Sequence, residues 1–245
     1  MAEELAFILR SVRYQDAAKV VTFLSREGGL RTGFARGATA RDNRFGASLE
    51  PLTLCRITGR RSGVLALYRI HHADIVEPYR TIHADFNLLS WAGLVSRFLL
   101  GCLPPEHPEP LLFSLTRETL SALETRKESA SRLWIRFARE GLAILGYRPP
   151  PPACTLCHRK VGEEKVLIRP SEGTVLCRLC RREEGKRGVE VPGQILDWLS
   201  GAGDISSLPG HWHEETLNFL DHMIGEHDPK WIPASSVTFL PEARD

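Results

Sequence analysis

Cys154-Thr155-Leu156-Cys157 and Cys177-Arg178-Leu179-Cys180 are two C-x2-C pairs separated by 19 residues in a chain of 245 residues. A two-residue gap lets both thiolates of a pair point inward from one tight turn, and two facing turns supply four ligands in a tetrahedron. Four thiolates saturate a zinc ion and leave no coordination position for water. We therefore predict one structural zinc ion, bound by Cys154, Cys157, Cys177 and Cys180.

The alternatives for these cysteines are two disulfides, coincidental thiol pairs, or a redox-active C-x-x-C pair. A redox motif would need only one pair, in an α/β pattern that this sequence does not show. The chain begins with the acidic stretch Met1-Ala2-Glu3-Glu4, unlike a signal peptide, and its longest apolar stretch, around Leu88 to Val95, is too short to span a bilayer. We expect a cytoplasmic protein, where closely spaced cysteines bind metal more often than they form disulfides.

The segments on either side of the cysteines indicate a zinc ribbon set between helices. Between the pairs, Glu164–Ile168 and Thr174–Leu176 predict a hairpin that turns at Pro170–Gly173. The prolines from Pro149 to Pro152 break the chain before this module. Apolar residues at helical spacing predict five helices, around 86–99, 110–123, 130–145, 194–199 and 214–224.

The first 80 residues have the period of strands. Five segments are rich in β-branched, aromatic and alternating apolar residues, namely Leu5–Val12, Lys19–Leu24, Leu30–Ala35, Leu49–Ile57 and Val64–Val76. Five short strands with glycine-rich turns predict a small closed barrel, for which the OB-fold is a frequent solution. The fold class is therefore α+β and multi-domain, with an N-terminal OB barrel, a helical domain and an inserted four-cysteine zinc ribbon.

Charge is segregated along the chain, although the net charge is only +2. Residues 31–61 hold seven arginines against two acids, whereas residues 191–245 hold two basic residues against nine acids. Arginine forms forked contacts with phosphate and stacks on bases, so the all-arginine cluster favours nucleic acid. A solvated charged face is the alternative. The candidate DNA-binding residues are Arg31, Arg36, Arg41, Arg44, Arg56, Arg60 and Arg61. Among them, we expect Arg36, Arg41 and Arg44 to matter most.

An OB surface binds single strands through a basic groove and aromatic side chains on which bases stack. Phe34, Phe45 and Tyr68 are the candidate stacking residues, although aromatic residues of a small barrel more often belong to its core. Without contacts to base edges, we expect no sequence specificity.

No sequence motif for catalysis accompanies the barrel. The chain lacks G-x-x-x-x-G-K-[ST], G-x-G-x-x-G and G-x-S-x-G, and no pair of carboxylates stands out as an acid–base couple. A zinc hydrolase or nucleobase deaminase needs an open metal position, which four thiolates do not leave. We predict a binding protein and not an enzyme. A zinc-ribbon adaptor or transcription regulator that acts mainly through protein contacts is the alternative.

In the order of its motifs, the chain resembles the RecO family of bacterial recombination mediators over nearly its full length. Four stretches carry the resemblance: Phe23 to Leu30, a strand and turn; Ala35-Arg36-Gly37-Ala38 followed by Leu49-Glu50-Pro51-Leu52; Arg136 to Tyr147; and the four cysteines. Glu50 and Leu52 depart from the residues that are commoner in the family.

The resemblance implies a domain order and an activity. The implied domains are an OB-fold over residues 1–80, helical parts over 81–150 and 191–245, and the zinc ribbon over 151–190. The implied activities are binding of single- and double-stranded DNA, annealing of complementary strands and assistance in recombinase loading. The implied partners are RecR and the single-stranded-DNA-binding protein, with no nucleotide and no membrane, in a cytoplasmic, nucleoid-associated protein.

Overall fold

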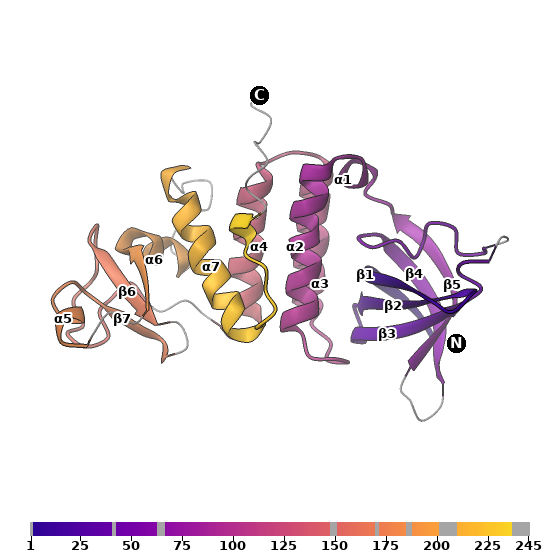
Figure 1. The fold of residues 1–245 in the computed structure, drawn as a ribbon, viewed down its shortest axis with the longest axis horizontal. Helices are drawn as coiled ribbons and strands as arrows, with labels where there is room; N and C mark the ends of the chain where they lie inside the picture. The colour runs from indigo at the N-terminus through magenta and orange to yellow at the C-terminus, as the bar shows by residue number, and fades with distance from the viewer. Residues whose placement is uncertain are drawn as a thin grey trace. The chain divides into compact units, whose positions relative to one another are not determined.

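The computed structural model describes residues 2–40, 43–62, 67–147, 151–169, 172–184, 188–200 and 210–236. The chain divides into two compact units, Met1–Lys127 and Glu128–Asp245, each with its own buried side chains. Figure 1 shows the ribbon of both units, with most helices and strands labelled. The finer division expected from the sequence, with boundaries near residues 80, 150 and 190, remains a prediction.

Five strands of the first unit close into a barrel (Figure 1): β1 (Ala2–Tyr14), β2 (Ala18–Ser25), β3 (Gly29–Arg36), β4 (Leu54–Ser62) and β5 (Leu67–Glu77). Their order around the barrel is β1-β2-β3-β5-β4. Strands β3 and β5 pair in parallel, and every other neighbouring pair is antiparallel. The predicted OB-like barrel is confirmed.

The barrel is filled by the inward-facing residues of alternating strands. Thirteen buried residues form this core, namely Ala6, Ile8, Val21, Phe23, Ala35, Ala38, Phe45, Leu49, Cys55, Ile57, Tyr68, Ile70 and Ala73. The strand predicted over Leu49–Ile57 was wrong at its start, because residues 49–52 form turns and a bend, and β4 begins at Leu54. Leu49 and Leu52 lie in these turns and are buried there. Their apolar side chains therefore give the sequence the pattern of a strand, although the backbone turns.

Three helices follow the barrel: α1 (Arg80–Ala84), α2 (Phe86–Cys102) and α3 (Pro110–Glu124). Of these, α2 packs against β1. Phe7 points away from the barrel core, and its ring centroid lies 5.0 Å from that of Phe113 and 6.5 Å from that of Tyr79. Strand β1 is therefore buried on both sides here, which explains its unbroken apolar run Ala6 to Leu9. The carboxylate of Asp85 caps α2 by accepting the N–H groups of Asn87 and Leu88.

The second unit combines helices with a three-stranded sheet. Its helices are α4 (Ala130–Ile144), α5 (Arg181–Glu184), α6 (Gly193–Leu199) and α7 (His213–His227). The sheet has the order β7-β6-β8, with β6 (Lys165–Arg169), β7 (Thr174–Leu176) and β8 (Val189–Pro192). Strands β6 and β7 form the predicted hairpin, whose turn lies partly outside the described residues, whereas β8 was not predicted.

Aromatic stacking holds the helical part of the second unit together. The ring of Trp134 on α4 stacks on Trp231, which follows α7, with centroids 5.8 Å apart, and also on Phe137 at 5.9 Å. Trp231 donates its indole N–H to Asp221 of α7 at 2.9 Å. Within the described parts of the chain, no helix has the length and apolar character needed to cross a membrane.

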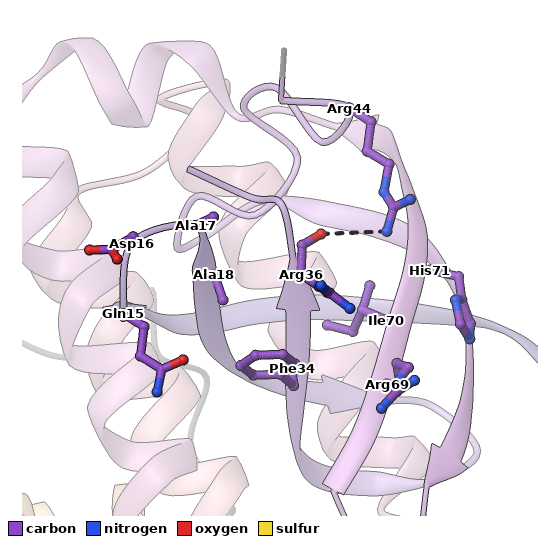
Figure 2. Close-up of a pocket in the computed structure, with 10 residues that line it drawn as sticks. All are labelled: Gln15, Asp16, Ala17, Ala18, Phe34, Arg36, Arg44, Arg69, Ile70 and His71. Carbon is purple, nitrogen blue, oxygen red and sulfur yellow. Dashed lines mark hydrogen bonds between the residues drawn. The ribbon is translucent and has the colours of Figure 1, made fainter. Parts of the chain in front are cut away.

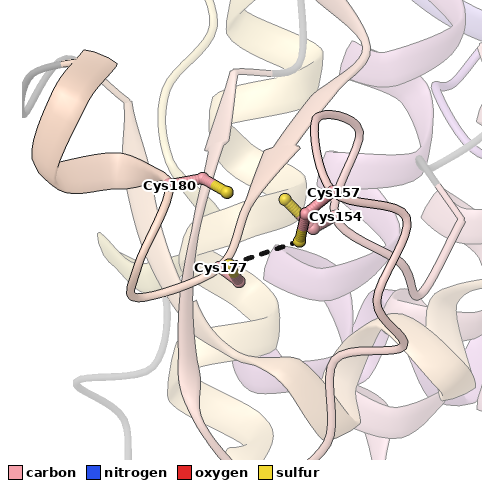
Figure 3. A group of neighbouring side chains, drawn as sticks. All are labelled: Cys154, Cys157, Cys177 and Cys180. Carbon is pink, nitrogen blue, oxygen red and sulfur yellow. Dashed lines mark hydrogen bonds between the residues drawn. The ribbon is translucent and has the colours of Figure 1, made fainter.

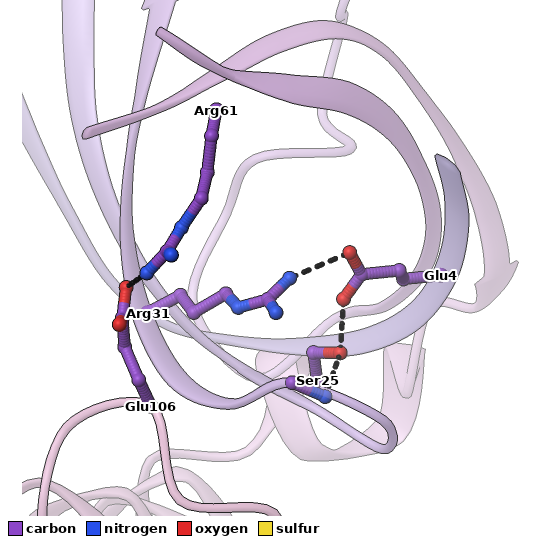
Figure 4. A network of polar contacts seen from close by, with 6 residues as sticks. Glu4, Ser25, Arg31, Arg61 and Glu106 are labelled. Carbon is purple, nitrogen blue, oxygen red and sulfur yellow. Dashed lines mark hydrogen bonds and ion pairs between the residues drawn. The ribbon is translucent and has the colours of Figure 1, made fainter. Parts of the chain in front are cut away.

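A buried polar network closes the barrel at the start of β3 (Figure 4). Arg31 points inward and donates to Glu4 at 2.6 Å, and the hydroxyl of Ser25 donates to the other oxygen of the same carboxylate. The loop after α2 lies against this end, because the N–H of Glu106 donates to the carbonyl of Leu30. Gly29, with φ of 69°, is required there, since a Cβ would lie 2.2 Å from the carbonyl oxygen of His107.

Removing the Glu4 carboxylate is expected to destabilise the first unit. Glu4→Ala leaves Arg31 and Ser25 without their acceptor in a mostly buried place, with side-chain exposures of 9% for Glu4 and 22% for Arg31. We expect a loss of about 2 kcal/mol in the free energy of unfolding, because buried hydrogen-bonding groups lose their partner. Glu3→Ala is the matched control, because Glu3 and Arg56 form a pair that is more than half exposed, and its loss costs about 0.5 kcal/mol. Urea unfolding measures both; equal losses would contradict a special role for Glu4.

Candidate nucleic-acid interface and metal centre

The seven arginines predicted to bind DNA separate into paired and unpaired residues. Arg31 pairs with Glu4, Arg56 with Glu3 at 2.9 Å, and Arg61 with Glu106 (Figure 4). Arg41 lies outside the described residues. Arg36, Arg44 and Arg60 are exposed and have no carboxylate partner among the residues described.

The outer surface of β3 and β5 brings unpaired arginines together. Phe34 of β3 stands in register with Arg69 of β5 across the parallel pair, while Ala35 and Ile70 face the core. Phe34, Arg36 and Arg69 therefore face outward, because successive residues of a strand alternate between its two sides. With Arg44, they line a cavity of about 550 Å³ on this surface (Figure 2).

Sequence reasoning missed Arg69, although it lies at the centre of this surface. Only the strand order reveals it, because β5 is distant from β3 in the chain. Arg60 of β4 stands directly opposite Arg69 in the antiparallel pair of β4 and β5. Like charges at opposed positions destabilise a sheet unless an anion lies between them. We name Arg36, Arg44, Arg60 and Arg69 the basic face.

A buried anchor holds Arg44 on the basic face. Phe45 is only 3% exposed, and its N–H donates to the side-chain carbonyl of Asn43 at 2.9 Å. Arg44 donates to the backbone carbonyl of Arg36 at 3.5 Å (Figure 2). The Arg44 guanidinium also lies 5.0 Å from the centroid of the Phe45 ring. Two guanidinium-bearing residues, from a loop and a strand, thus meet at one place.

Of the three candidate stacking residues, only Phe34 lies on the outer surface. Phe45 and Tyr68 are buried, and the Tyr68 ring contacts that of Phe23 edge-on at 5.7 Å inside the barrel. Burial, followed by the charge of Glu4, raises the pKa of Tyr68 to about 12. Tyr68 is therefore a neutral core residue, whereas Phe34 is half-buried beside the arginines.

The four cysteines predicted to bind metal converge in the second unit (Figure 3). Their sulfur atoms all lie within 4.8 Å of one another, and Cys157 Sγ lies 3.8 Å from Cys177 Sγ. The first pair is tied to β7, because the N–H of Thr155 donates to the carbonyl of Val175 at 2.8 Å. The arrangement offers four soft ligands and could hold a metal ion such as zinc.

Backbone dipoles favour thiolates at the buried sulfurs. Burial acts to raise the pKa of Cys154, but N–H groups of Cys157, Cys177 and Leu156 outweigh it and bring that pKa down to about 6. The pKa of Cys177 is lowered too: burial opposes the shift, and N–H groups of Cys180 and Leu179 outweigh burial. Thiolates are the form in which cysteine binds metal, so the backbone turns prepare these two ligands.

Comparison with known proteins identifies the family. The family models described as "Recombination protein O N terminal" and "Recombination protein O C terminal" match residues 1–79 and 83–235. The DNA repair protein RecO of Thermodesulfovibrio yellowstonii is 34% identical over 220 residues, which cover 89% of this chain and 83% of that protein. RecO of Myxococcus xanthus is 28% identical over 226 residues, 91% of this chain and 90% of that protein. The chain therefore belongs to the RecO family of DNA repair proteins.

Proposed function

We propose that this protein is a recombination mediator that binds single- and double-stranded DNA, anneals complementary strands and helps load the recombinase. RecR and the single-stranded-DNA-binding protein are its proposed partners, and the cytoplasm, with the nucleoid, its proposed location. The observation that carries the proposal is the basic face, where Arg36, Arg44, Arg60 and Arg69 are exposed and find no carboxylate partner in the part of the chain that the structure describes. Family membership supports the repair role.

The basic face favours contacts with phosphates. Opposed Arg60 and Arg69 repel each other across the sheet, and a phosphate backbone between them removes that repulsion. Arginine neutralises phosphates without regard to sequence, and each neutralised phosphate releases counterions. Such contacts fix the position of a strand but carry no base information. Binding to mixed sequences is the expected result.

Annealing follows from holding two strands on one positive surface. Two single strands repel each other through their phosphates, and the guanidinium groups of the basic face screen this repulsion. Bases that point away from the surface remain free to pair. The process requires positioning only, so we propose that the protein acts without catalysing a covalent step and without a nucleotide.

Replacing the three arginines that line the cavity is expected to weaken DNA binding in a salt-dependent manner. In the Arg36→Ala, Arg44→Ala, Arg69→Ala variant, the slope of log affinity against log salt on single strands should shrink by about 2, at about 0.7 per lost phosphate contact. The affinity for all sequences should fall equally, and annealing should slow with it. Fluorescence anisotropy with a mixed-sequence strand at several salt concentrations measures the slope.

A charge-matched variant separates the basic face from net charge. Arg80→Ala, Arg117→Ala and Arg126→Ala remove the same charge from α1, α3 and the turn that follows α3. This control should keep the slope of the unmodified protein. An unchanged slope in the basic-face variant, or equal reductions in both variants, would refute the proposed interface.

We also propose that the metal is a single zinc ion with a structural role. Zinc–sulfur bonds of about 2.3 Å in a tetrahedron separate neighbouring sulfurs by about 3.8 Å, which is the distance between Cys157 Sγ and Cys177 Sγ. The donor set therefore fits zinc. When bound, zinc supplies no reactive water here, because all four positions are thiolates; it holds the two turns together.

Loss of one ligand is expected to lower metal content and stability together. Cys177→Ser should reduce bound zinc well below one per chain and destabilise the ribbon, because structural zinc contributes on the order of 10 kcal/mol to the folding of such modules. The Cys177→Ser change should alter the free energy of DNA binding less than it alters the free energy of unfolding. Cys102→Ser, in the first unit, is the control and should keep its zinc. Metal analysis of protein purified without chelator tests this; no zinc in the unmodified protein would remove the claim.

A further inference from the structure

An aromatic pair lies on the outer surface of the barrel beside the basic face. The ring centroids of Tyr14 and Phe34 are 5.9 Å apart, at an interplanar angle of 81°. Tyr14 is 48% exposed, although it stands at the end of a long strand whose middle is buried on both sides. Its cross-strand partner is Ala18, which in turn pairs with Arg36, so a small side chain separates the Tyr14 position from the arginines.

The adjoining cavity carries opposite charges on its two sides. Arg44 and Arg69 lie on one side of Phe34, and the turn that holds Gln15 and Asp16 lies on the other (Figure 2). The turn is fixed because the hydroxyl of Thr39 donates to the backbone carbonyl of Asp16 at 3.1 Å. A phosphate is attracted to the arginine side and repelled by Asp16. A second phosphate is therefore disfavoured beside Gln15 and Phe34, whereas an uncharged group can enter there.

A nucleobase has the properties that this arrangement selects. It is planar and uncharged, its face stacks on aromatic rings, and its edge hydrogen-bonds to an amide such as that of Gln15. The cavity of about 550 Å³ falls within the range of roughly 300–1,000 Å³ that is usual for small-ligand pockets. A base attached to a phosphate on the arginine side is placed to reach the aromatic pair.

We propose that Tyr14, Phe34 and the cavity beside them form a subsite for an unpaired nucleobase. This inference rests on the proposed DNA binding and adds a distinction between strand types. A duplex offers its phosphates to the basic face, but its bases are covered above and below by their neighbours. A single strand offers both, so the subsite favours single strands and releases a strand as its bases become paired.

Removing the rings should weaken binding of single strands alone. In the Tyr14→Leu, Phe34→Leu variant, affinity for a mixed-sequence single strand should fall roughly 5- to 150-fold, the range for the loss of one stacked base. Affinity for a duplex and the salt slope should remain unchanged, because no phosphate contact is lost. Tyr14→Phe with Phe34→Tyr keeps both rings and should bind as the unmodified protein does.

A second binding experiment uses the unmodified protein, so its result does not depend on how the variant folds. An oligonucleotide with abasic sites keeps its phosphates but has no base to stack. The unmodified protein should bind it more weakly than the complete strand by a similar factor, and the leucine variant should bind both strands equally.

Equal affinity of the unmodified protein for abasic and complete strands would overturn the subsite, as would an equal loss of single-strand and duplex affinity in the leucine variant. In both cases the salt-dependent binding to the basic face would persist, and the proposed function would stand. Absence of any DNA binding by the unmodified protein would overturn both proposals.

Discussion

The parallel pairing of β3 with β5 is the constraint on which the proposed DNA surface depends. It closes the barrel and fixes which side of each strand faces the core. Gly33 permits this pairing, since a Cβ at that position would lie 2.8 Å from the side chain of Ile70. Once Ala35 and Ile70 are inside, Phe34, Arg36 and Arg69 are outside. The same alternation turns Arg31 inward, where it meets Glu4.

The two ends of β3 show how the surroundings of an arginine decide its role. Arg31, at the start, is mostly buried and satisfies the carboxylate of Glu4, so it stabilises the barrel. Arg36, at the end, is exposed and has no carboxylate partner among the described residues. A buried charge without a partner is unstable, whereas an exposed arginine is stable but gains from an external anion. The surface proposed to bind a polyanion is therefore the one where the described residues supply no carboxylate partner.

Local patterns in the sequence predicted most elements, because strand alternation, helical spacing and cysteine spacing are all short-range signals. Ligand spacing alone brought the four cysteines together correctly as a cluster. The predictions that were missing or wrong concern residues whose positions depend on long-range strand pairing or on turns. Arg69 and Tyr14 acquire their significance only when β5 lies beside β3 and β1 beside β2, and Leu49 imitates a strand residue because a turn buries it. The ion pair that the inward-pointing side chain of Arg31 forms likewise requires Glu4, which is 27 residues away in the chain.

The central claim is that unpaired arginines on the outer barrel surface contact the DNA backbone. Arginine-selective chemical modification of the whole protein, with and without a saturating single strand, maps these contacts by mass spectrometry in one experiment. We expect DNA to protect Arg36, Arg44, Arg60 and Arg69 and to leave the reactivity of Arg56 and Arg80 unchanged. Protection confined to arginines of the cysteine module, such as Arg178 and Arg182, with the barrel arginines fully reactive, would contradict it.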